Sequence, residues 1–204
     1  VNFETMMISR FQMFKAVYFH KTVRAGEVML LEAMSLADDH LGLSSMSAQE
    51  YVKQTDDTIL EQLTSLPESN SELRAAKKIA VDYQNRKLFK CVFEKTISGK
   101  KTFAKNTLKQ FRKDIAKKSK LDENQIFIDT TTTHSMPLAP SKKESNSIIL
   151  IKKEGSKITP QTIPISEIPL VSTMSGKMNI LRAYTQQKNR NKVEIAAKSI
   201  LGEL

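Results

Sequence analysis

A stretch near the N-terminus carries side chains that could bind a nucleotide. In RFQMFKAVYFHKTVRAGEVML, residues 10–30, a helical period of about 100° per residue places four side chains in one row, with Arg24 close to it and His20 on a flank: Arg10, Phe14, Tyr18 and Lys21. Arginine binds phosphate oxygens with a planar fork, lysine supplies a point charge, and tyrosine lies against sugars and bases. The structural alternative is that Phe14 and Tyr18 belong to the core and the cations pair with carboxylates.

The element that must position this row is a long helix. Apolar residues recur at three- and four-residue spacing from Phe3 to Leu41 without a proline, and Gly42 supplies a stop. The pattern predicts one helix over this range, bent at Gly26.

Three shorter helices are predicted to follow. Capping patterns mark their starts, namely Ser47 with Glu50, Thr55 with Asp56 and Asp57, and one residue of the segment 69–71. Two of these helices end near Leu66, and the third runs to about Asn85 with its apolar residues on one side. The first 86 residues therefore read as all α.

After residue 86 the apolar period changes to that of strands. Alternation or β-branched runs predict strands at 87–95, 125–133 and 147–154, and at best an edge strand at the proline-broken 158–168. A basic amphipathic helix covers 106–120, and KMNILRAYT with a final helix from about Asn191 to Leu204 closes the chain. The fold class is α+β: a helical segment, 1–86, with one long helix, then a small α+β domain, 87–204, with a mostly antiparallel sheet.

Composition limits the partners. The net charge of +10 points to an anionic partner, either nucleic acid, nucleotide phosphates or a membrane surface. The uninterrupted apolar runs are too short to span a bilayer, and a single cysteine, Cys91, excludes an internal disulfide and predicts a cytoplasmic protein. Cys91 falls in the middle of a strand, which favours a buried, inert thiol. Because the chain begins at Val1 inside a helical pattern, we expect a fragment of a longer polypeptide.

Four segments in order carry a family resemblance. The four segments are RFQMFKAVYFHKTVRAGEVML, LADDH, YVKQTDDTILEQL and NRKLFKCVFEK, and a fainter match is LRAYTQQKNRNKVEIAAKSI. They resemble the part of HD-domain dNTP triphosphohydrolases that follows the catalytic core. The resemblance covers most of the chain. It implies an upstream HD domain in the same polypeptide, a dNTP or other nucleotide as ligand, and homo-oligomers.

The resemblance also implies roles for individual residues. Arg10 matches the family arginine that contacts substrate phosphates, and Tyr18 matches the tyrosine that packs against the substrate sugar and base. Four further residues match positions that bind an activating nucleotide in mammalian members, the last of them more loosely: His20, Lys21, Lys77 and Lys152. Where those members have a second lysine one turn after the Lys77 match, this chain has Val81, which weakens the case for regulation.

The catalytic metal ligands of that family are not found in this sequence. The family hydrolyses dNTPs at a metal held by a His, a His-Asp pair and a distant Asp. This chain has three histidines, His20, His40 and His134, and none precedes an aspartate. His40 reads as a helix-terminal surface residue. We therefore expect no catalytic residue, metal ligand or cofactor in this chain, a divalent metal in the missing HD core, and no hydrolysis by the chain alone.

A second class of function stays open. A non-enzymatic module could use the basic α+β half to bind nucleic acid, or to oligomerise, although its strands lack the aromatic pairs that stack bases in sheet-based RNA binders. The run KKSK, 117–120, suits the dipole at a helix end, which favours a solvated cap over a nucleic-acid contact.

Overall fold

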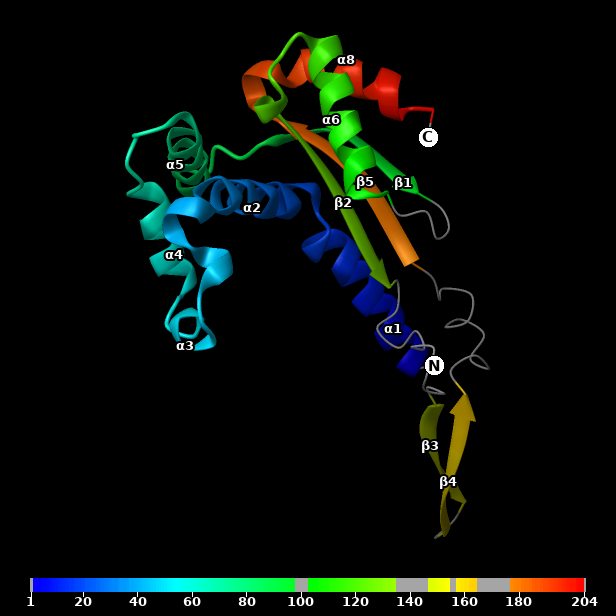
Figure 1. Ribbon diagram of the computed structural model, residues 1–204. Coiled ribbons are helices and arrows are strands. Elements are labelled where there is room, and N and C mark those ends of the chain that lie inside the picture. Colours follow the sequence, from blue (N-terminus) through cyan, green and yellow to red (C-terminus); the bar gives the residue numbers. More distant parts are fainter. Residues whose placement is uncertain (1, 98–102, 135–146, 155–156, 165–176, 204) are drawn as a thin grey trace. The chain divides into compact units, whose positions relative to one another are not determined.

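The computed structural model describes residues 2–97, 103–134, 147–154, 157–164 and 177–203 (Figure 1). The fold is α+β, with helices at the N-terminus followed by strands and helices, as the sequence predicts. The helices are α1 (Asn2–Met13), the π-helix η1 (Phe14–Tyr18), α2 (Lys21–Leu41), η2 (Leu43–Ser45), α3 (Ala48–Tyr51), α4 (Asp56–Thr64), α5 (Ser71–Gln84), α6 (Lys105–Ser119), η3 (Glu123–Gln125), η5 (Gln187–Asn189) and α8 (Arg190–Leu201). The strands are β1 (Lys90–Ile97), β2 (Ile126–His134), β3 (Ser147–Glu154), β4 (Lys157–Pro164) and β5 (Lys177–Thr185).

The chain forms two compact units, each built from separate stretches of sequence. Unit 1 comprises 1–19, 95–104 and 130–181, and unit 2 comprises 20–94, 105–129 and 182–204. The boundary expected between residues 86 and 87 divides the sequence into a helical and a mixed half, and it stays a prediction.

The expected continuous helix from Phe3 to Leu41 is interrupted at Phe19 and His20, and it is not Gly26 that interrupts it. The Phe19 N–H bonds to the Phe14 carbonyl at 2.8 Å, an i to i−5 bond that closes the π-helix η1. His20 then takes an extended conformation, and its Nδ1 accepts a hydrogen bond from the Thr22 N–H at 3.3 Å, which caps α2. The long helix is therefore α2 alone, with 21 residues.

Gly26 lies inside α2, where a neighbouring aromatic ring needs its small size. A Cβ on Gly26 would lie 3.2 Å from Cε2 of Tyr83 in α5. The close approach fits the extensive packing of α2 on α5. The sequence predicted a bend at Gly26, whereas in the structure the small size of this residue allows α2 to pack closely on α5.

Local capping signals were confirmed. Ser47 and Glu50 form a capping box at α3, and Thr55 caps α4 with Asp56 and Asp57 in its first turn. Asn70, within the segment expected to cap the next helix, accepts a hydrogen bond from the Leu73 N–H at 2.8 Å. These short-range contacts fix where the helices of unit 2 begin.

The main core of unit 2 joins these helices to the strand ends. Its buried apolar side chains include Met29, Ala33, Leu63, Ala76, Phe89, Phe127 and Tyr184. The rings of Phe89 and Phe127 stack with centroids 4.3 Å apart. α2 therefore has a buried face that packs on α4 and α5 and shares a core with Phe89, Phe127 and Tyr184 at the strand ends.

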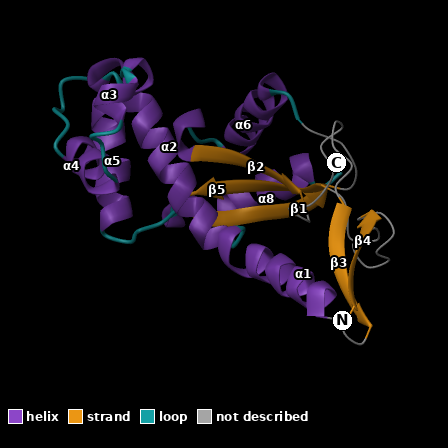
Figure 2. Cartoon of the chain, turned by 90° about the horizontal axis from the view of Figure 1, so that it is seen from below, coloured by secondary structure: helices purple, strands orange, loops and turns teal. Residues whose placement is uncertain are grey.

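The strands form one three-stranded antiparallel sheet and one hairpin. The sheet has the order β1-β5-β2, and Figure 2 shows these strands side by side, with α8 behind them in that view. β1 begins at Lys90, three residues later than predicted, after Arg86 adopts a positive φ of 57°. β3 and β4 pair antiparallel from Ser147 opposite Pro164 to Glu154 opposite Lys157. The proline-containing segment is therefore confirmed as a strand up to residue 164, and the rest of the predicted range, 165–168, lies outside the described residues.

Candidate functional site

Arg10, Phe14 and Tyr18 form a continuous row across the junction of α1 and η1. The Arg10 guanidinium carbon lies 4.8 Å from the centroid of the Phe14 ring, within the range of a cation–π contact. The Tyr18 ring lies 4.8 Å from the Phe14 ring at an interplanar angle of 39°. The i, i+4 spacing predicted from the sequence is thus kept through the π-helix, and Phe14 joins the two candidate substrate contacts.

The ends of this row are open to solvent. Tyr18 is 50% exposed and Arg10 is exposed, so the structural alternative in which Tyr18 belongs to the core is wrong for the chain as described. Among the described residues Arg10 forms no ion pair. Lys21, predicted to continue the row, begins α2 after the break at His20 and lies outside the helical stretch that carries the other three.

The structure places the four candidate regulatory residues in different settings. His20 is the N-cap of α2 and Lys21 is its first residue, so they are adjacent at one helix start. Lys77 in α5 pairs with Glu68 at 3.3 Å, which partly neutralises its charge. Lys152 lies in β3, opposite Thr159 of β4, and belongs to unit 1, whereas the other three belong to unit 2. Val81 is half-buried in α5.

Arg24 pairs with a carboxylate, as the structural alternative predicted for the cations of this stretch. Its guanidinium donates two hydrogen bonds to the buried carboxylate of Asp129 in β2, Nε to Oδ2 at 3.1 Å and Nη2 to Oδ1 at 2.5 Å, and it also contacts Glu27. Burial lowers the pKa of Arg24, but the hydrogen bond and charge of Asp129, with the charges of Glu27 and Tyr184, together raise it by more, so the pKa lies above its usual value. The pair joins α2 to the sheet.

Tyr184 in β5 also connects α2 to the sheet. It is fully buried, and its hydroxyl donates a hydrogen bond to the Lys21 carbonyl at 3.2 Å. Burial raises its pKa above the ordinary value. Sequence reasoning missed Asp129 and Tyr184, and the only available signal was a carboxylate inside an apolar strand segment, 126–129.

The single cysteine of the chain lies within a strand, as the sequence predicted. Cys91 lies within β1 and is half-buried, and its Sγ donates to the Phe93 carbonyl at 3.3 Å. Burial, with a smaller contribution from the charge of Glu94, raises its pKa. A thiol with a raised pKa is a poor nucleophile.

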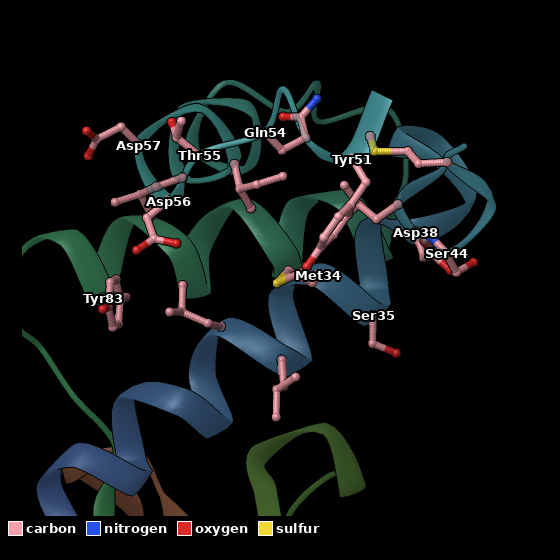
Figure 3. Close-up of a pocket in the computed structure, with 16 residues that line it drawn as sticks. Met34, Ser35, Asp38, Ser44, Tyr51, Gln54, Thr55, Asp56, Asp57 and Tyr83 are labelled. Carbon is pink, nitrogen blue, oxygen red and sulfur yellow. Dashed lines mark hydrogen bonds between the residues drawn. The ribbon is translucent and has the colours of Figure 1, made fainter. Parts of the chain in front are cut away.

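A groove of about 860 Å³ lies between α2 and the segment from η2 to α4 in unit 2 (Figure 3). Its size falls within the range of ligand pockets. No lysine, arginine or histidine is among the residues that line it, so it offers no cation to a phosphate group. Its carboxylates have structural roles: Asp38 accepts hydrogen bonds from Ser44, while Asp56 and Asp57 occupy the first turn of α4. We do not assign the groove to a nucleotide.

The described residues do not fit a catalytic metal. They contain no group of three His, Cys, Asp or Glu side chains arranged to hold a metal ion. His40 is exposed in the last turn of α2, as predicted, and His134 ends β2. Within the described part of the chain, no helix is both long and apolar enough to cross a membrane.

Comparison with known proteins identifies the family. The profile described as HD associated region matches residues 2–202, and the chain therefore belongs to this family of HD-associated regions. No curated protein matches the sequence.

Two solved structures share the fold. One is a phosphohydrolase from Bacteroides thetaiotaomicron, with 18% identity and a TM-score of 0.52, matched over 90% of this chain and 49% of that one. Another is a hypothetical protein from Aquifex aeolicus, with 18% identity and a TM-score of 0.58, matched over 97% of this chain and 45% of that one. The chain thus spans about half the length of these relatives, and at this identity the likeness concerns the fold alone.

Proposed function

We propose that this chain is the C-terminal part of an HD-type phosphohydrolase that converts a dNTP to a deoxynucleoside and triphosphate. Its membership of the HD-associated family and its fold, which a phosphohydrolase shares, support an HD phosphohydrolase role. The observation that carries the nucleotide contact is the row of Arg10, Phe14 and Tyr18, with exposed ends, that runs from α1 into a π-helix, a feature that is frequent at functional sites.

In this proposal the chain binds and orients the nucleotide. The Arg10 guanidinium, held over the Phe14 ring and without a carboxylate partner among the described residues, donates to phosphate oxygens. The Tyr18 ring packs against the sugar and base. A divalent metal held in the HD core would supply the activation of water and the polarisation of the phosphate, and the described residues of this chain contain no group that would hold it.

The exposed apolar residues of α1 and η1 support an HD core as the neighbour of this surface. Met6, Met13 and Val17 are 55%, 41% and 53% exposed, as expected for a helix whose partner domain lies elsewhere in the polypeptide. We further propose that the protein forms homo-oligomers and that His20, Lys21, Lys77 and Lys152 contact an activating nucleotide. A non-enzymatic module is the alternative.

The test begins with the complete reading frame, which should encode a His, a His-Asp pair and a distant Asp upstream of Val1. In the protein that it encodes, Arg10→Gln should raise KM for dNTP by about 10- to 100-fold, the loss expected for one hydrogen bond to a charged group. Lys15→Gln is the matched control, because Lys15 is an exposed cation on the same π-helix but outside the row.

A reading frame without these metal ligands would favour the non-enzymatic alternative. Equal KM values for the Arg10→Gln and Lys15→Gln proteins would instead remove Arg10 from the substrate site while leaving the phosphohydrolase assignment in place.

A further inference from the structure

The positive charge of the chain is unevenly distributed. Residues 20–85 contain eleven acidic against six Lys or Arg residues, a formal charge of −5. By contrast, residues 105–120 contain seven Lys or Arg residues and one acidic residue, and residues 187–202 contain four and one. The cationic excess therefore lies outside the helices that form the groove: residues 86–104 carry a formal charge of +5, residues 105–120 of +6 and residues 187–202 of +3.

The fold brings residues 105–120 and 187–202 together. α6 and α8 pack against each other in unit 2, with Ile115 and Ala116 of one helix and Val193 and Ala197 of the other buried. Lys118 of α6 reaches Ser199 of α8 at the exposed edge of this contact. Two basic segments that are about 70 residues apart in sequence are thus in contact, which the sequence alone does not reveal.

We define the α6–α8 face by its exposed cations, which are Lys105, Lys109, Lys113, Lys117 and Lys120 from α6 and its C-terminal end, and Lys188, Arg190 and Lys192 from η5 and α8. None of them forms an ion pair with another described residue, although the pKa of Glu194 is lowered by the hydrogen bond and charge of Lys198 and, to a smaller extent, by the charge of Arg190. Nearby cations that are neutralised are Arg112, which pairs with Glu32 at 3.2 Å, and Lys198, which pairs with Glu194 at 2.7 Å. The cations of the face are therefore available to an external anion.

We propose that the α6–α8 face binds the phosphate backbone of a nucleic acid, a function beyond the nucleotide contact proposed above. α6 has 15 residues and is about 22 Å long, a span of six to seven nucleotides at about 3.4 Å each. Repeated lysines over this length match a polyanion better than a single nucleotide. At the end of α6, where Lys118 reaches Ser199 of α8, the proposal replaces the solvated cap predicted for KKSK.

The composition of the face favours nucleic acid over a membrane and predicts binding without sequence preference. Ile195, 71% exposed, is the single exposed large apolar side chain on the described α6 and α8, whereas helices that bind membrane surfaces insert several. The one aromatic residue of the two helices, Phe111, is half-buried and does not form a platform for bases. Contacts to phosphates carry no sequence information.

The experiment measures fluorescence anisotropy of a labelled single-stranded DNA of about 16 nucleotides, and of the corresponding duplex, with the full chain between about 50 and 200 mM salt. The triple variant Lys109→Gln, Lys113→Gln, Lys117→Gln should bind at least about tenfold more weakly at low salt. Its slope of log K against log salt should fall by about 2, since each lost phosphate contact removes about 0.7–0.9.

The matched control is Lys53→Gln, Lys78→Gln, Lys87→Gln, which removes three exposed lysines outside the face and should bind within about twofold of the unaltered chain. Circular dichroism melts establish that both triple variants fold. Equal binding by the two variants, or no binding of either DNA, would overturn the proposal.

Further measurements distinguish the α6–α8 face from other sites that could bind an anion. Saturating dNTP should not displace the DNA, and Arg10→Gln should bind it normally. Loss of DNA binding in Arg10→Gln would overturn the α6–α8 assignment without affecting the phosphohydrolase proposal. Binding to phosphatidylserine vesicles that depends on Lys109, Lys113 and Lys117, without DNA binding, would identify a membrane surface instead.

Discussion

Tyr184 shows how one buried polar atom determines the position of a helix start. Its ring is fully buried in the core of unit 2, while its hydroxyl donates to the carbonyl of Lys21, the first residue of α2. A buried hydroxyl without a partner is costly, so this hydrogen bond favours one position of the helix start relative to β5. The two residues are 163 positions apart, a pairing that no local pattern signals.

Removal of this hydroxyl should destabilise the protein without opening a cavity. Tyr184→Phe keeps the ring and loses one hydrogen bond, which should lower the free energy of unfolding by about 0.5–1.5 kcal/mol. Thermal unfolding should show a Tm lower by about 1–5 °C. Tyr51→Phe is the control, because Tyr51 is 69% exposed and should leave the Tm unchanged. Equal Tm values for Tyr184→Phe and the unaltered protein would show that the Lys21 carbonyl finds another donor.

Some candidate residues are positioned by local helix spacing, which the sequence reveals, and others by tertiary contacts, which it does not. The i, i+4 spacing of Arg10, Phe14 and Tyr18 is visible in the sequence, and the structure keeps them in a row. Lys21 does not continue that row, because the chain leaves the helix at His20. The pairing of Arg24 with Asp129 depends on tertiary packing, and helical periodicity does not reveal it.

At the scale of elements, helix ends were predictable where a side chain caps its own helix. Ser47, Thr55 and the segment around Asn70 act within three residues, so their sequence pattern determines the contact. The break after Tyr18 was not predictable in the same way. The run from Val17 to His20 combines β-branched and aromatic residues of middling helix propensity, so its composition does not distinguish a continued α-helix from a π-turn followed by a histidine cap.

The C-terminal end of α2 has a cap whose strength depends on pH. Asp38 accepts hydrogen bonds from the Ser44 N–H at 2.8 Å and the Ser44 hydroxyl at 2.6 Å, after Gly42 has turned the chain at a φ of 64°. The hydroxyl, followed by the N–H, lowers the pKa of Asp38 below its ordinary value of 3.8. The contribution of this carboxylate is therefore complete above that ordinary value and is lost as the pH falls through the lowered pKa.

Asp38→Asn should lower the Tm at pH 7, and the difference from the unaltered protein should shrink as the pH falls below about 3.8. The measurement is a series of thermal melts of both proteins between neutral and acidic pH. Asp39→Asn, at the neighbouring exposed position, should show no comparable difference. A difference between the Asp38→Asn and unaltered proteins that stays constant with pH would show that the ionised carboxylate is not what stabilises the turn.

At the scale of the whole chain, the class of fold was predictable and its assembly was not. The change from helical to strand period near residue 86 predicts α+β, because the period reports on local conformation. The sheet order β1-β5-β2 depends on contacts between strands more than 30 residues apart. Composition also predicted an anionic partner, but only the packing of α6 on α8 shows where the cations gather.

Within unit 2, the Arg24–Asp129 pair is a test of how firmly α2 is held to the sheet. The Arg24 side chain is 17% exposed and that of Asp129 is 8% exposed, so removing Arg24 takes away the guanidinium that bonds both oxygens of a buried carboxylate. Arg24→Gln should therefore reduce the free energy of unfolding by about 3 kcal/mol. Glu27→Gln removes the other carboxylate that contacts Arg24, but that carboxylate is 46% exposed, and the loss should be below about 1 kcal/mol.

A double-mutant cycle separates the pair from its surroundings. If the two groups stabilise each other directly, Arg24→Gln combined with Asp129→Asn should cost less than the sum of the single changes by about 1–3 kcal/mol, measured by urea denaturation. Additive losses would mean that each side chain is stabilised by its own neighbours, and this pair would then not be what holds α2 to the sheet. Since Tyr184 also reaches the first turn of α2, a large coupling would make this helix start, where His20 and Lys21 lie, the most firmly anchored part of the candidate regulatory region.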